Sequence, residues 1–294
     1  MRKYRGIFFD WDGTAVTSRK SPVDEVILEM KKLLKNDVKL AIISGTTIEN
    51  IAGGNLEDYF EEDELKNLFL GLGRGAYNYR FGKNKKIEIF SNNIPNKELL
   101  LKIHKVCFDI HLELLEKYDF KTDIVFSRPN YCKIDLMVDS NRGDNLFFQE
   151  DELMVLKDNL KIHNFYGGVQ GLIELAVKIG EKHGLLLSVT TDAKYLEVGL
   201  STKSDNVDCI LEYFNENFSI TPDQCSFWGD EYIGLDENLY GSDSFMITEL
   251  SRDGDFFDVS NAIGYRPKEV KVISGGVNRF LKFLNEQGNE KENE

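Results

Sequence analysis

Residues 5–14 read Arg5-Gly6-Ile7-Phe8-Phe9-Asp10-Trp11-Asp12-Gly13-Thr14. The apolar run ends at two carboxylates one residue apart, and Gly13 then lets the chain turn sharply. A short apolar run bounded by turn residues predicts a strand buried on both faces, as in a parallel sheet. Such sheets bind ligands outside the carboxyl ends of their strands. Because side chains alternate along a strand, Asp10 and Asp12 can face one pocket there while Trp11 points away.

The pair Asp10 and Asp12 has two interpretations. Two close carboxylates share a pocket when a hard divalent cation or one raised pKa offsets their repulsion. That arrangement suits phosphoryl chemistry, with one Asp as nucleophile, the other as acid and base, and Mg2+ neutralising the phosphate. The alternative is a strand end with two solvated acids, because Asp-Gly is also a common turn. The rest of the chain favours the first interpretation.

The composition is that of a globular chain of 294 residues with one or two domains. A formal net charge of −14 argues against nucleic acid or an anionic membrane as the main partner. No apolar run approaches the roughly 18 residues that span a bilayer, and residues 1–5 lead into a strand rather than a signal-peptide core. The four cysteines lack metal-ligand spacing and are expected to be reduced. We therefore expect a cytoplasmic protein, either a monomer or a homodimer.

A second strand with polar residues at its end follows. Val38–Ile43 is the expected strand, and hydroxyl and glycine residues come directly after it: Ser44, Gly45, Thr46 and Thr47. A helix over about Thr47–Asn55 would point free N–H groups at the crevice that holds Asp10. Taken alone, a Ser or Thr here is better explained as a helix cap than as a ligand-binding residue.

A third strand is expected at Leu68–Leu72, and Gly71–Ala76 formally matches the Gly-x-Gly-x-x-Ala dinucleotide fingerprint. That fingerprint requires a helix after the turn, whereas residues 76–90 read as a β-hairpin. The nucleotide interpretation is therefore rejected.

The pattern changes over residues 77–192, where strands and helices are segregated as in an α+β unit. The expected elements are the hairpin, helices over about Asn96–Lys117, Asn145–Leu160 and Val169–His183, and strands Asp123–Ser127, Lys133–Asp139, Leu185–Thr190 and Lys194–Gly199.

Alternation of strands and helices then resumes. Lys203 opens a helix, and the strand Ser226–Trp228 ends in Gly229-Asp230-Glu231, a second acidic cluster at a strand end. Later elements are strands Phe245–Thr248 and Val270–Ile273 and a closing helix Val277–Leu284, followed by a polar tail, residues 285–294, that is expected to be disordered.

These groups, in this order, resemble the four motifs of the haloacid dehalogenase-like (HAD) hydrolase superfamily. The matching motifs are Asp10-Trp11-Asp12-Gly13-Thr14, Ile43-Ser44-Gly45-Thr46, Lys203 and Gly229-Asp230. The resemblance implies an α/β fold, with a Rossmann-like parallel-sheet core (residues 1–76 and 193–284) and an inserted α+β cap domain (residues 77–192). A cap in that position is similar to those of Cof-like phosphatases, sucrose- and trehalose-phosphate phosphatases and eukaryotic phosphomannomutases.

The resemblance also implies roles for individual residues. Asp10 would be the nucleophile that forms an aspartyl-phosphate, and Asp12 the general acid and base. Mg2+ would be bound by Asp10, the main-chain carbonyl of Asp12 and Asp230, with support from Asp236 or, as second choice, Glu231. The phosphoryl oxygens would be held by Ser44 and Lys203, and other substrate contacts would come from Gly45, Thr46 and, in the cap, Arg128.

The function implied is a Mg2+-dependent phosphatase acting on a small phosphorylated metabolite, most plausibly a sugar or polyol phosphate. One alternative is a phosphomutase that uses the same aspartyl-phosphate. Another is a non-enzymatic phospho-acceptor module, although such modules are far smaller and need no cap.

Overall fold

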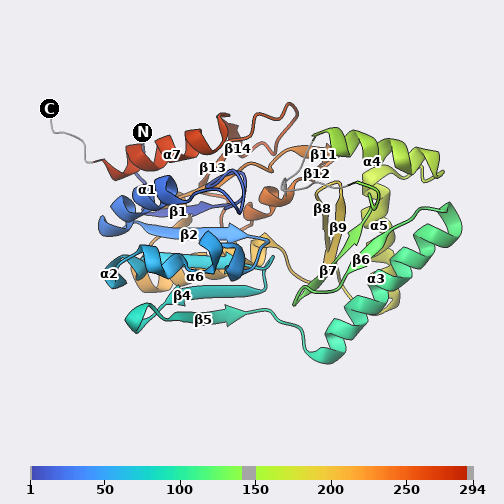
Figure 1. Cartoon of the computed structure of the whole chain (residues 1–294), viewed down its shortest axis with the longest axis horizontal. Coiled ribbons are helices and arrows are strands. Elements are labelled where there is room, and N and C mark those ends of the chain that lie inside the picture. The colour runs from blue at the N-terminus through green and yellow to red at the C-terminus, as the bar shows by residue number, and fades with distance from the viewer. Residues whose placement is uncertain (1, 141–149, 290–294) are drawn as a thin grey trace.

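The computed structural model describes residues 2–140 and 150–289, and they form a core and a cap (Figure 1). The core is an eight-stranded sheet with the strand order β14-β13-β10-β1-β2-β3-β4-β5. Six of these strands run parallel: β1 (Gly6–Phe9), β2 (Lys39–Ser44), β3 (Leu68–Leu72), β10 (Cys225–Gly229), β13 (Asp255–Asp258) and β14 (Val270–Val272). The parallel-sheet core with an inserted α+β cap is therefore confirmed.

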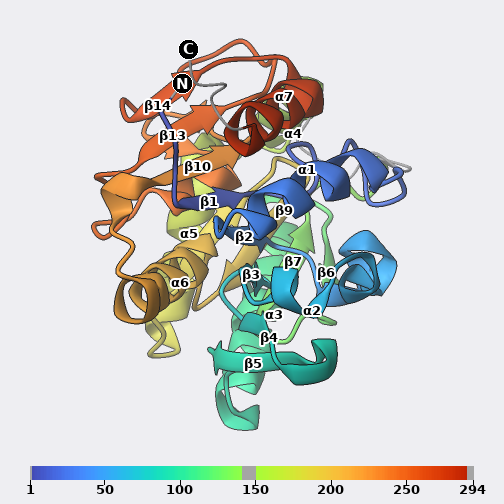
Figure 2. The same cartoon turned by 90° about the vertical axis from the view of Figure 1, so that its left-hand side faces the viewer.

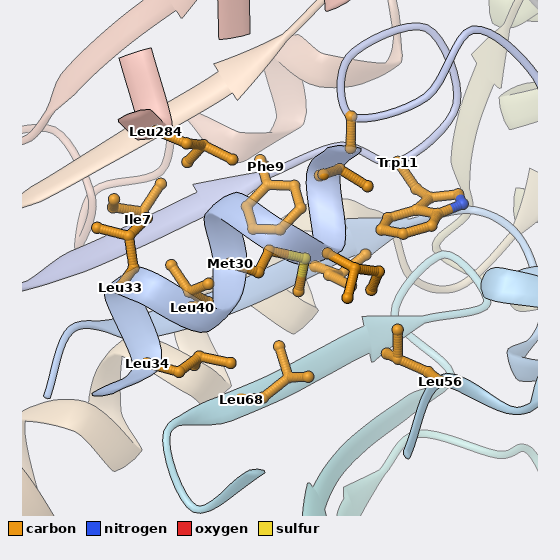
Figure 3. Packing of buried hydrophobic residues seen from close by; sticks show 14 of the residues in the cluster. Ile7, Phe9, Trp11, Met30, Leu33, Leu34, Leu40, Leu56, Leu68 and Leu284 are labelled. Carbon is orange, nitrogen blue, oxygen red and sulfur yellow. The ribbon is translucent and has the colours of Figure 1, made fainter. Parts of the chain in front are cut away.

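The central strand β1 is buried on both faces, as its apolar run predicts. Ile7 and Phe9 pack with α1 (Asp24–Lys35) and α7 (Gly276–Gly288), whereas Phe8 faces the opposite side and packs with α6 (Lys203–Phe218). Figure 2 shows α1 and α7 on one side of the strands and α6 on the other. Trp11 lies in the first of these two apolar clusters (Figure 3), so it points away from the acidic pocket as expected.

The hairpin expected to open the cap belongs to the core instead. β4 (Tyr77–Phe81) pairs antiparallel with β3, and β5 (Ile87–Asn92) pairs antiparallel with β4. A tight turn through Gly73 and Gly75, both at positive φ, returns the chain onto the free edge of β3. The first core segment therefore extends to about residue 92 rather than 76.

The cap consists of an antiparallel sheet backed by helices. Its strand order is β6 (Asp123–Val125), β7 (Tyr131–Asp135), β9 (Tyr195–Gly199) and β8 (Ser188–Thr191). In Figure 1 this sheet lies between the core and the two helices α3 (Lys97–Tyr118) and α5 (Gly168–Lys182). Because β9 pairs with both β7 and β8, the cap ends after Gly199 rather than at residue 192.

A third cap helix, α4 (Glu150–Ile162), corresponds to the helix expected over Asn145–Leu160. Residues 145–149 of that expectation lie outside the described residues.

The segment expected as a helix over Thr47–Asn55 forms short 3-10 turns, Ile48–Asn50 and Ala52–Gly54, followed by a third at Leu56–Tyr59. Gly53 and Gly54 adopt positive φ, and Ile51 is extended, so a continuous α-helix cannot form. A four-residue helix, α2 (Glu62–Leu65), precedes β3.

The chain after β10 also differs from expectation. A small hairpin, β11 (Gly234–Asp236) and β12 (Leu239–Tyr240), leads to a 3-10 turn at Ser242–Met246, where a strand was expected over Phe245–Thr248. The next core strand is β13, which the sequence pattern did not reveal.

Helix α7 continues four residues beyond its expected end, because Gln287 is buried against the N-terminal segment and donates to the Arg2 carbonyl. Of the tail expected to be disordered, residues 285–288 are thus helical, and residues 290–294 lie outside the described part. In the described part of the chain, no helix combines the length and apolarity needed to cross a bilayer.

Candidate active site

The carboxyl ends of β1, β2 and β10 and the start of α6 meet at one edge of the core sheet, facing the cap. A cleft with an empty volume of about 780 Å³ lies there. Its lining includes these expected site residues: Asp10, Asp12, Ser44, Gly45, Thr46, Arg128, Lys203 and Glu231. Three strand ends and one helix start that are distant in sequence thus contribute to one pocket.

Lys203 is the cation at the centre of this site. It is the first residue of α6, where Thr202 caps the helix together with Asp205. Its Nζ donates to Asp10 Oδ1 at 2.7 Å and to Asp243 Oδ1 at 2.7 Å. Burial by itself would lower the pKa of Lys203, but the two carboxylates outweigh burial and raise that pKa well above its usual value. The lysine therefore remains charged.

Asp243 is a site residue that the sequence pattern did not reveal. It is fully buried, and its Oδ2 accepts hydrogen bonds from the main-chain N–H groups of Asp230 (2.9 Å) and Glu231 (2.8 Å). One carboxylate therefore connects Lys203 to the loop that follows β10. Its place in the polar turn Gly241–Ser244 is the signal that the sequence offers for it, and Asp236 lies closer to Asp230 in the chain.

Asp236, the first choice for support of the metal, lies elsewhere. It is on β11, outside the cleft, and its Oδ2 accepts from the main-chain N–H of Gln170 in the cap at 3.4 Å. The β11–β12 hairpin explains the difference, because Gly241 N bonds to Ile233 O at 2.8 Å and returns the chain to the site after the hairpin. Glu231, the second choice, lines the cleft and accepts from Ser242 Oγ at 2.8 Å.

Asp230 is held against the first motif. Thr14 Oγ1 donates to Asp230 Oδ1 at 3.0 Å. Gly13 has φ +89°, and a Cβ at this position would lie 2.1 Å from Asp230 Oδ2. Only glycine allows this close approach of the two motifs.

The acids of the site outnumber its cations. Burial raises the pKa values of Asp10 and Asp230 well above their usual range, and the neighbouring Asp243 raises both further. Lys203 opposes this effect without cancelling it. The pocket is therefore short of positive charge, which is the condition a divalent cation relieves.

The residues present fit Mg2+ in chemical type. Magnesium is usually bound through one or two carboxylates, with waters and substrate phosphate filling the other positions. Asp10 and Asp230 are two such carboxylates, and the expected third protein ligand is a main-chain carbonyl, that of Asp12. Among residues 2–140 and 150–289, no group of three or more His, Cys, Asp or Glu side chains is arranged to ligate an ion.

Asp12 has a partner that the sequence did not predict. Arg19 Nε donates to Asp12 Oδ2 at 2.8 Å, and both residues line the cleft. Asp12 Oδ1 is buried without a hydrogen-bond partner in the described part of the chain. The arginine fixes one oxygen of the expected acid and base and leaves the other available.

The end of β2 supplies hydroxyl and amide groups to the same cleft. Ser44 Oγ accepts from Thr46 N at 3.3 Å, and Thr46 Oγ1 is buried with no partner found among the described residues. Ser44, Gly45 and Thr46 thus form a small polar surface beside Asp10, although no α-helix begins there.

The cap side of the cleft contains a buried ionic network. Arg74, from the turn between β3 and β4, reaches Glu197 on β9 (Nε–Oε2 3.2 Å), and Lys133 on β7 reaches the other oxygen of the same carboxylate (Nζ–Oε1 2.8 Å). Arg74 also donates to the carbonyls of Ser201 (2.6 Å) and Ser188 (3.0 Å). The turn that resembled a dinucleotide fingerprint therefore joins the core to the cap.

No protein-family model matches this sequence, and no curated protein matches it. Among solved structures, the chain is similar to the IMP-nucleotidase of Plasmodium falciparum. A truncated, IMP-bound form matches with a TM-score of 0.60 and 14% identity over 96% of this chain and 68% of that chain. A longer form of that enzyme gives 0.57 and 12%, and this chain spans only 62% of its length.

The sucrose-phosphatase of Synechocystis, solved with sucrose and phosphate, matches with a TM-score of 0.50 and 11% identity over 97% of this chain and 99% of that chain. At such low identities these likenesses establish the fold, including the inserted cap.

Proposed function

We propose that this chain, whose fold is that of the capped haloacid dehalogenase-like phosphatases, is a Mg2+-dependent phosphatase that hydrolyses a phosphate monoester of a small metabolite. One observation carries the proposal. Lys203 Nζ lies 2.7 Å from Asp10 Oδ1 and 2.7 Å from Asp243 Oδ1, and Asp230 and Glu231 are further carboxylates around this one buried cation. A nucleophilic carboxylate beside a fixed cation suits attack on a phosphate dianion.

The first step belongs to Asp10. One of its carboxylate oxygens attacks phosphorus, and the bond from phosphorus to the alcohol oxygen breaks. Asp12 donates a proton to that oxygen, so the product leaves as a neutral alcohol. Arg19 holds Asp12 by one oxygen, which leaves the partnerless Oδ1 as the oxygen that carries the proton.

The second step releases phosphate. Asp12 takes a proton from a water molecule as that water attacks the phosphorus of the aspartyl-phosphate, and the bond from Asp10 to phosphorus breaks. Splitting one hard displacement into two easier ones is the benefit of covalent catalysis. The cap excludes bulk water while both steps occur.

The remaining residues bind and orient the phosphoryl group. The hydroxyls of Ser44 and Thr46 and the ammonium of Lys203 supply donors to its oxygens. Asp10, the Asp12 carbonyl and Asp230 would hold Mg2+, which neutralises phosphate charge when bound. Asp243 keeps the Asp230 main chain and Lys203 in position.

The substrate is proposed to be small and polar, with a sugar or polyol phosphate as the first class to examine. Pockets that take small molecules place a few polar groups around the ligand, and the cleft has such groups on both its core side and its cap side. Charged side chains line it together with hydroxyl side chains such as Thr190, Thr191 and Ser242.

All four cysteines are free, which supports a reducing compartment such as the cytoplasm.

Phosphate release tests the proposal. The substrates are p-nitrophenyl phosphate and a panel of sugar, polyol, nucleotide and amino-acid phosphates, each with Mg2+ and with EDTA. We expect Mg2+-dependent release by the wild type, loss of release in Asp10→Asn, and normal release in Asp253→Asn, which changes an exposed carboxylate. Release that survives in Asp10→Asn contradicts the mechanism. Isomerised sugar phosphate without free phosphate indicates a mutase, and a stable phosphoenzyme without turnover indicates a phospho-acceptor module.

A further inference from the structure

The cap wall of the cleft has cationic donors that the proposed mechanism does not use. We propose that Arg128 and Lys133 form a subsite for a second anionic group, so that the substrate carries a phosphate or carboxylate in addition to the phosphate that is cleaved. This inference rests on the proposed function and narrows its substrate class.

Arg128 is the first part of the subsite. It follows β6, lines the cleft and is partly buried. Its Nε is buried and has no hydrogen-bond partner in the described part of the chain. A buried guanidinium N–H without an acceptor raises the free energy of the folded protein. An acceptor is therefore expected there when substrate is bound.

Lys133 is the second part. Its side chain is 19% exposed and lines the same cleft. Glu197 is the hydrogen-bond acceptor found for its ammonium among the described residues, and an ammonium has three donors. Burial would lower the pKa of Lys133, but Glu197 more than offsets burial and raises it. The ammonium also lies over the Tyr195 ring, 5.0 Å from its centre. A charged lysine with a donor beyond these two contacts therefore lines the cleft.

The charges of the cap wall also favour an anionic ligand. Its three cations are Arg74, Arg128 and Lys133, and its two carboxylates are Asp192 and Glu197. Arg74 already has four acceptors for its five N–H donors, namely Glu197, two carbonyls and the Thr190 hydroxyl, so the proposal does not use it. One positive charge is left over on the part of the wall that contains Arg128 and Lys133.

Arg128 and Lys133 come from one short stretch of the cap. Arg128 lies in the segment before β7, Lys133 lies on that strand, and both line the cleft. Tyr131, between them in the sequence, is buried, and the Arg74 guanidinium lies over its ring at 5.3 Å. Arg128 and Lys133 thus enter the cleft from the same end of β7, and the subsite is proposed there.

The chemistry of these donors defines the ligand. Arginine binds phosphate and carboxylate through parallel N–H donors, and lysine adds a point charge. The floor of the cleft already provides for the cleaved phosphate through Ser44 and Lys203. The substrate then has two anionic ends separated by a short polar body, as in a sugar bisphosphate or a phosphorylated sugar acid.

Three compounds of similar size test this inference: glucose 6-phosphate, 6-phosphogluconate and glucose 1,6-bisphosphate. At C1, where glucose 6-phosphate has a hydroxyl, 6-phosphogluconate has a carboxylate on an open chain and glucose 1,6-bisphosphate has a phosphate. We expect Asp10→Asn, in which turnover is stopped, to bind at least one of the two roughly tenfold or more tightly than glucose 6-phosphate in calorimetric titration. The preferred compound identifies the second anion as carboxylate or phosphate. Equal affinity for all three overturns the inference.

A second variant locates the effect. Adding Arg128→Gln or Lys133→Gln to Asp10→Asn should remove most of the preference for the doubly anionic compound and leave affinity for glucose 6-phosphate within about threefold. Arg252→Gln, which changes an exposed arginine outside the cleft, should preserve the preference. A uniform loss of affinity for all three compounds would mean that Arg128 has a structural role only.

The two proposals fail in different ways. p-Nitrophenyl phosphate lacks a second anionic group, so its Mg2+-dependent hydrolysis by the wild type reports on the phosphatase chemistry alone. If it is hydrolysed and the binding preference is absent, the subsite inference fails and the phosphatase proposal stands. If it is not hydrolysed and the panel gives no phosphate, the proposed function fails.

Discussion

Asp243 shows how one buried side chain organises this site. Its two oxygens satisfy three donors: the Lys203 ammonium and the main-chain N–H groups of Asp230 and Glu231. A carboxylate that accepts several hydrogen bonds in a buried place is fixed in position. The orientation of Lys203 toward Asp10 and the path of the Asp230 loop thus depend on the same residue.

Replacement of Asp243 by Asn is therefore expected to reduce kcat by roughly a hundredfold or more, because Lys203 and the Asp230 loop lose their common anchor. The measurement is hydrolysis of p-nitrophenyl phosphate at saturating Mg2+. Asp236→Asn is the matched comparison and should retain activity within about twofold, since Asp236 lies outside the cleft. If Asp236→Asn lost more activity than Asp243→Asn, Asp236 rather than Asp243 would be assigned to the active site.

Gly13 provides a second test at this scale. Gly13→Ala would place a methyl group 2.1 Å from the present position of Asp230 Oδ2 at φ +89°, so Asp230 must move. We expect the Mg2+ concentration for half-maximal activity to rise about tenfold, corresponding to roughly 1.4 kcal/mol of binding energy. Gly53→Ala has the same sign of φ (+69°) with no atom within 4 Å, and it reports the cost of the backbone conformation alone. Unchanged Mg2+ dependence in Gly13→Ala would show that Asp230 does not contact the ion.

At the scale of elements, strand β9 places Glu197 between two cations from different parts of the chain. Arg74 comes from the turn after β3, and Lys133 from β7. Burial alone would raise the pKa of Glu197, but the two cations outweigh burial and lower it to about 2, from 4.5 in an unperturbed glutamate. The carboxylate therefore stabilises the fold only while it is ionised.

This lowered pKa gives a pH dependence with a definite sign. The stabilisation is fully present above pH 4.5, the unperturbed value, and is lost as pH falls toward 2. Its size is on the order of 3 kcal/mol. The measurement is the free energy of unfolding in urea at several pH values between 7 and 3. At neutral pH we expect a lower value for Glu197→Gln than for the wild type, and we expect the difference between the two values to become smaller as the pH falls. A difference that stays constant with pH would contradict the ionised network. Glu216→Gln, on the exposed side of α6, should change stability by less than about 0.5 kcal/mol.

At the scale of the whole molecule, hydrogen bonds among residues 2–140 and 150–289 attach the cap to the core at two separate places. One is Arg74, whose guanidinium bonds to β8 and to the segment after β9. The other is the β11–β12 hairpin, where Lys157 of α4 donates to Leu235 O at 2.9 Å and Leu239 packs on the apolar core of the cap. Two separated attachments oppose rotation of the cap about either linker, so any opening for substrate must disrupt at least one of them.

The Arg74 attachment is the stronger of the two in chemical terms, because it is buried and ionic. Arg74→Gln leaves Glu197 with one cation instead of two, and we expect it to lower the free energy of unfolding by about 3–5 kcal/mol. Hydrogen exchange of Ser188–Thr191 and Tyr195–Gly199 should become faster as the cap loosens. Arg80→Gln removes an ion pair whose arginine is 43% exposed and should cost no more than about 1 kcal/mol. Equal protection in Arg74→Gln and the wild type would show that the cap is held mainly by the hairpin.

The sequence predicted much of this architecture from short-range patterns. Apolar runs located β1, β2, β3 and β10, and the polar residues at their ends brought Asp10, Asp12, Ser44 and Asp230 to one edge of the sheet. The pattern did not assign the β4–β5 hairpin to the core, because free strand edges on both the core and the cap could have accepted it. β13 was also missed, since its short run Asp255–Asp258 begins and ends with a charged residue.

By itself, then, the sequence determined the strands, the order of the motifs and the residues at the strand ends, because these depend on local periodicity and turn residues. Only the tertiary structure decided that Asp243 binds Lys203 while Asp236, expected to support the metal, lies outside the cleft, that Arg19 holds Asp12, and that Arg74 and Lys133 share Glu197. The Asp243, Arg19 and Arg74 contacts involve loops whose paths depend on the packing of the rest of the chain, and the Lys133–Glu197 contact depends on the pairing of β7 with β9. Charge and distance in the folded chain, which no local pattern encodes, select the partner.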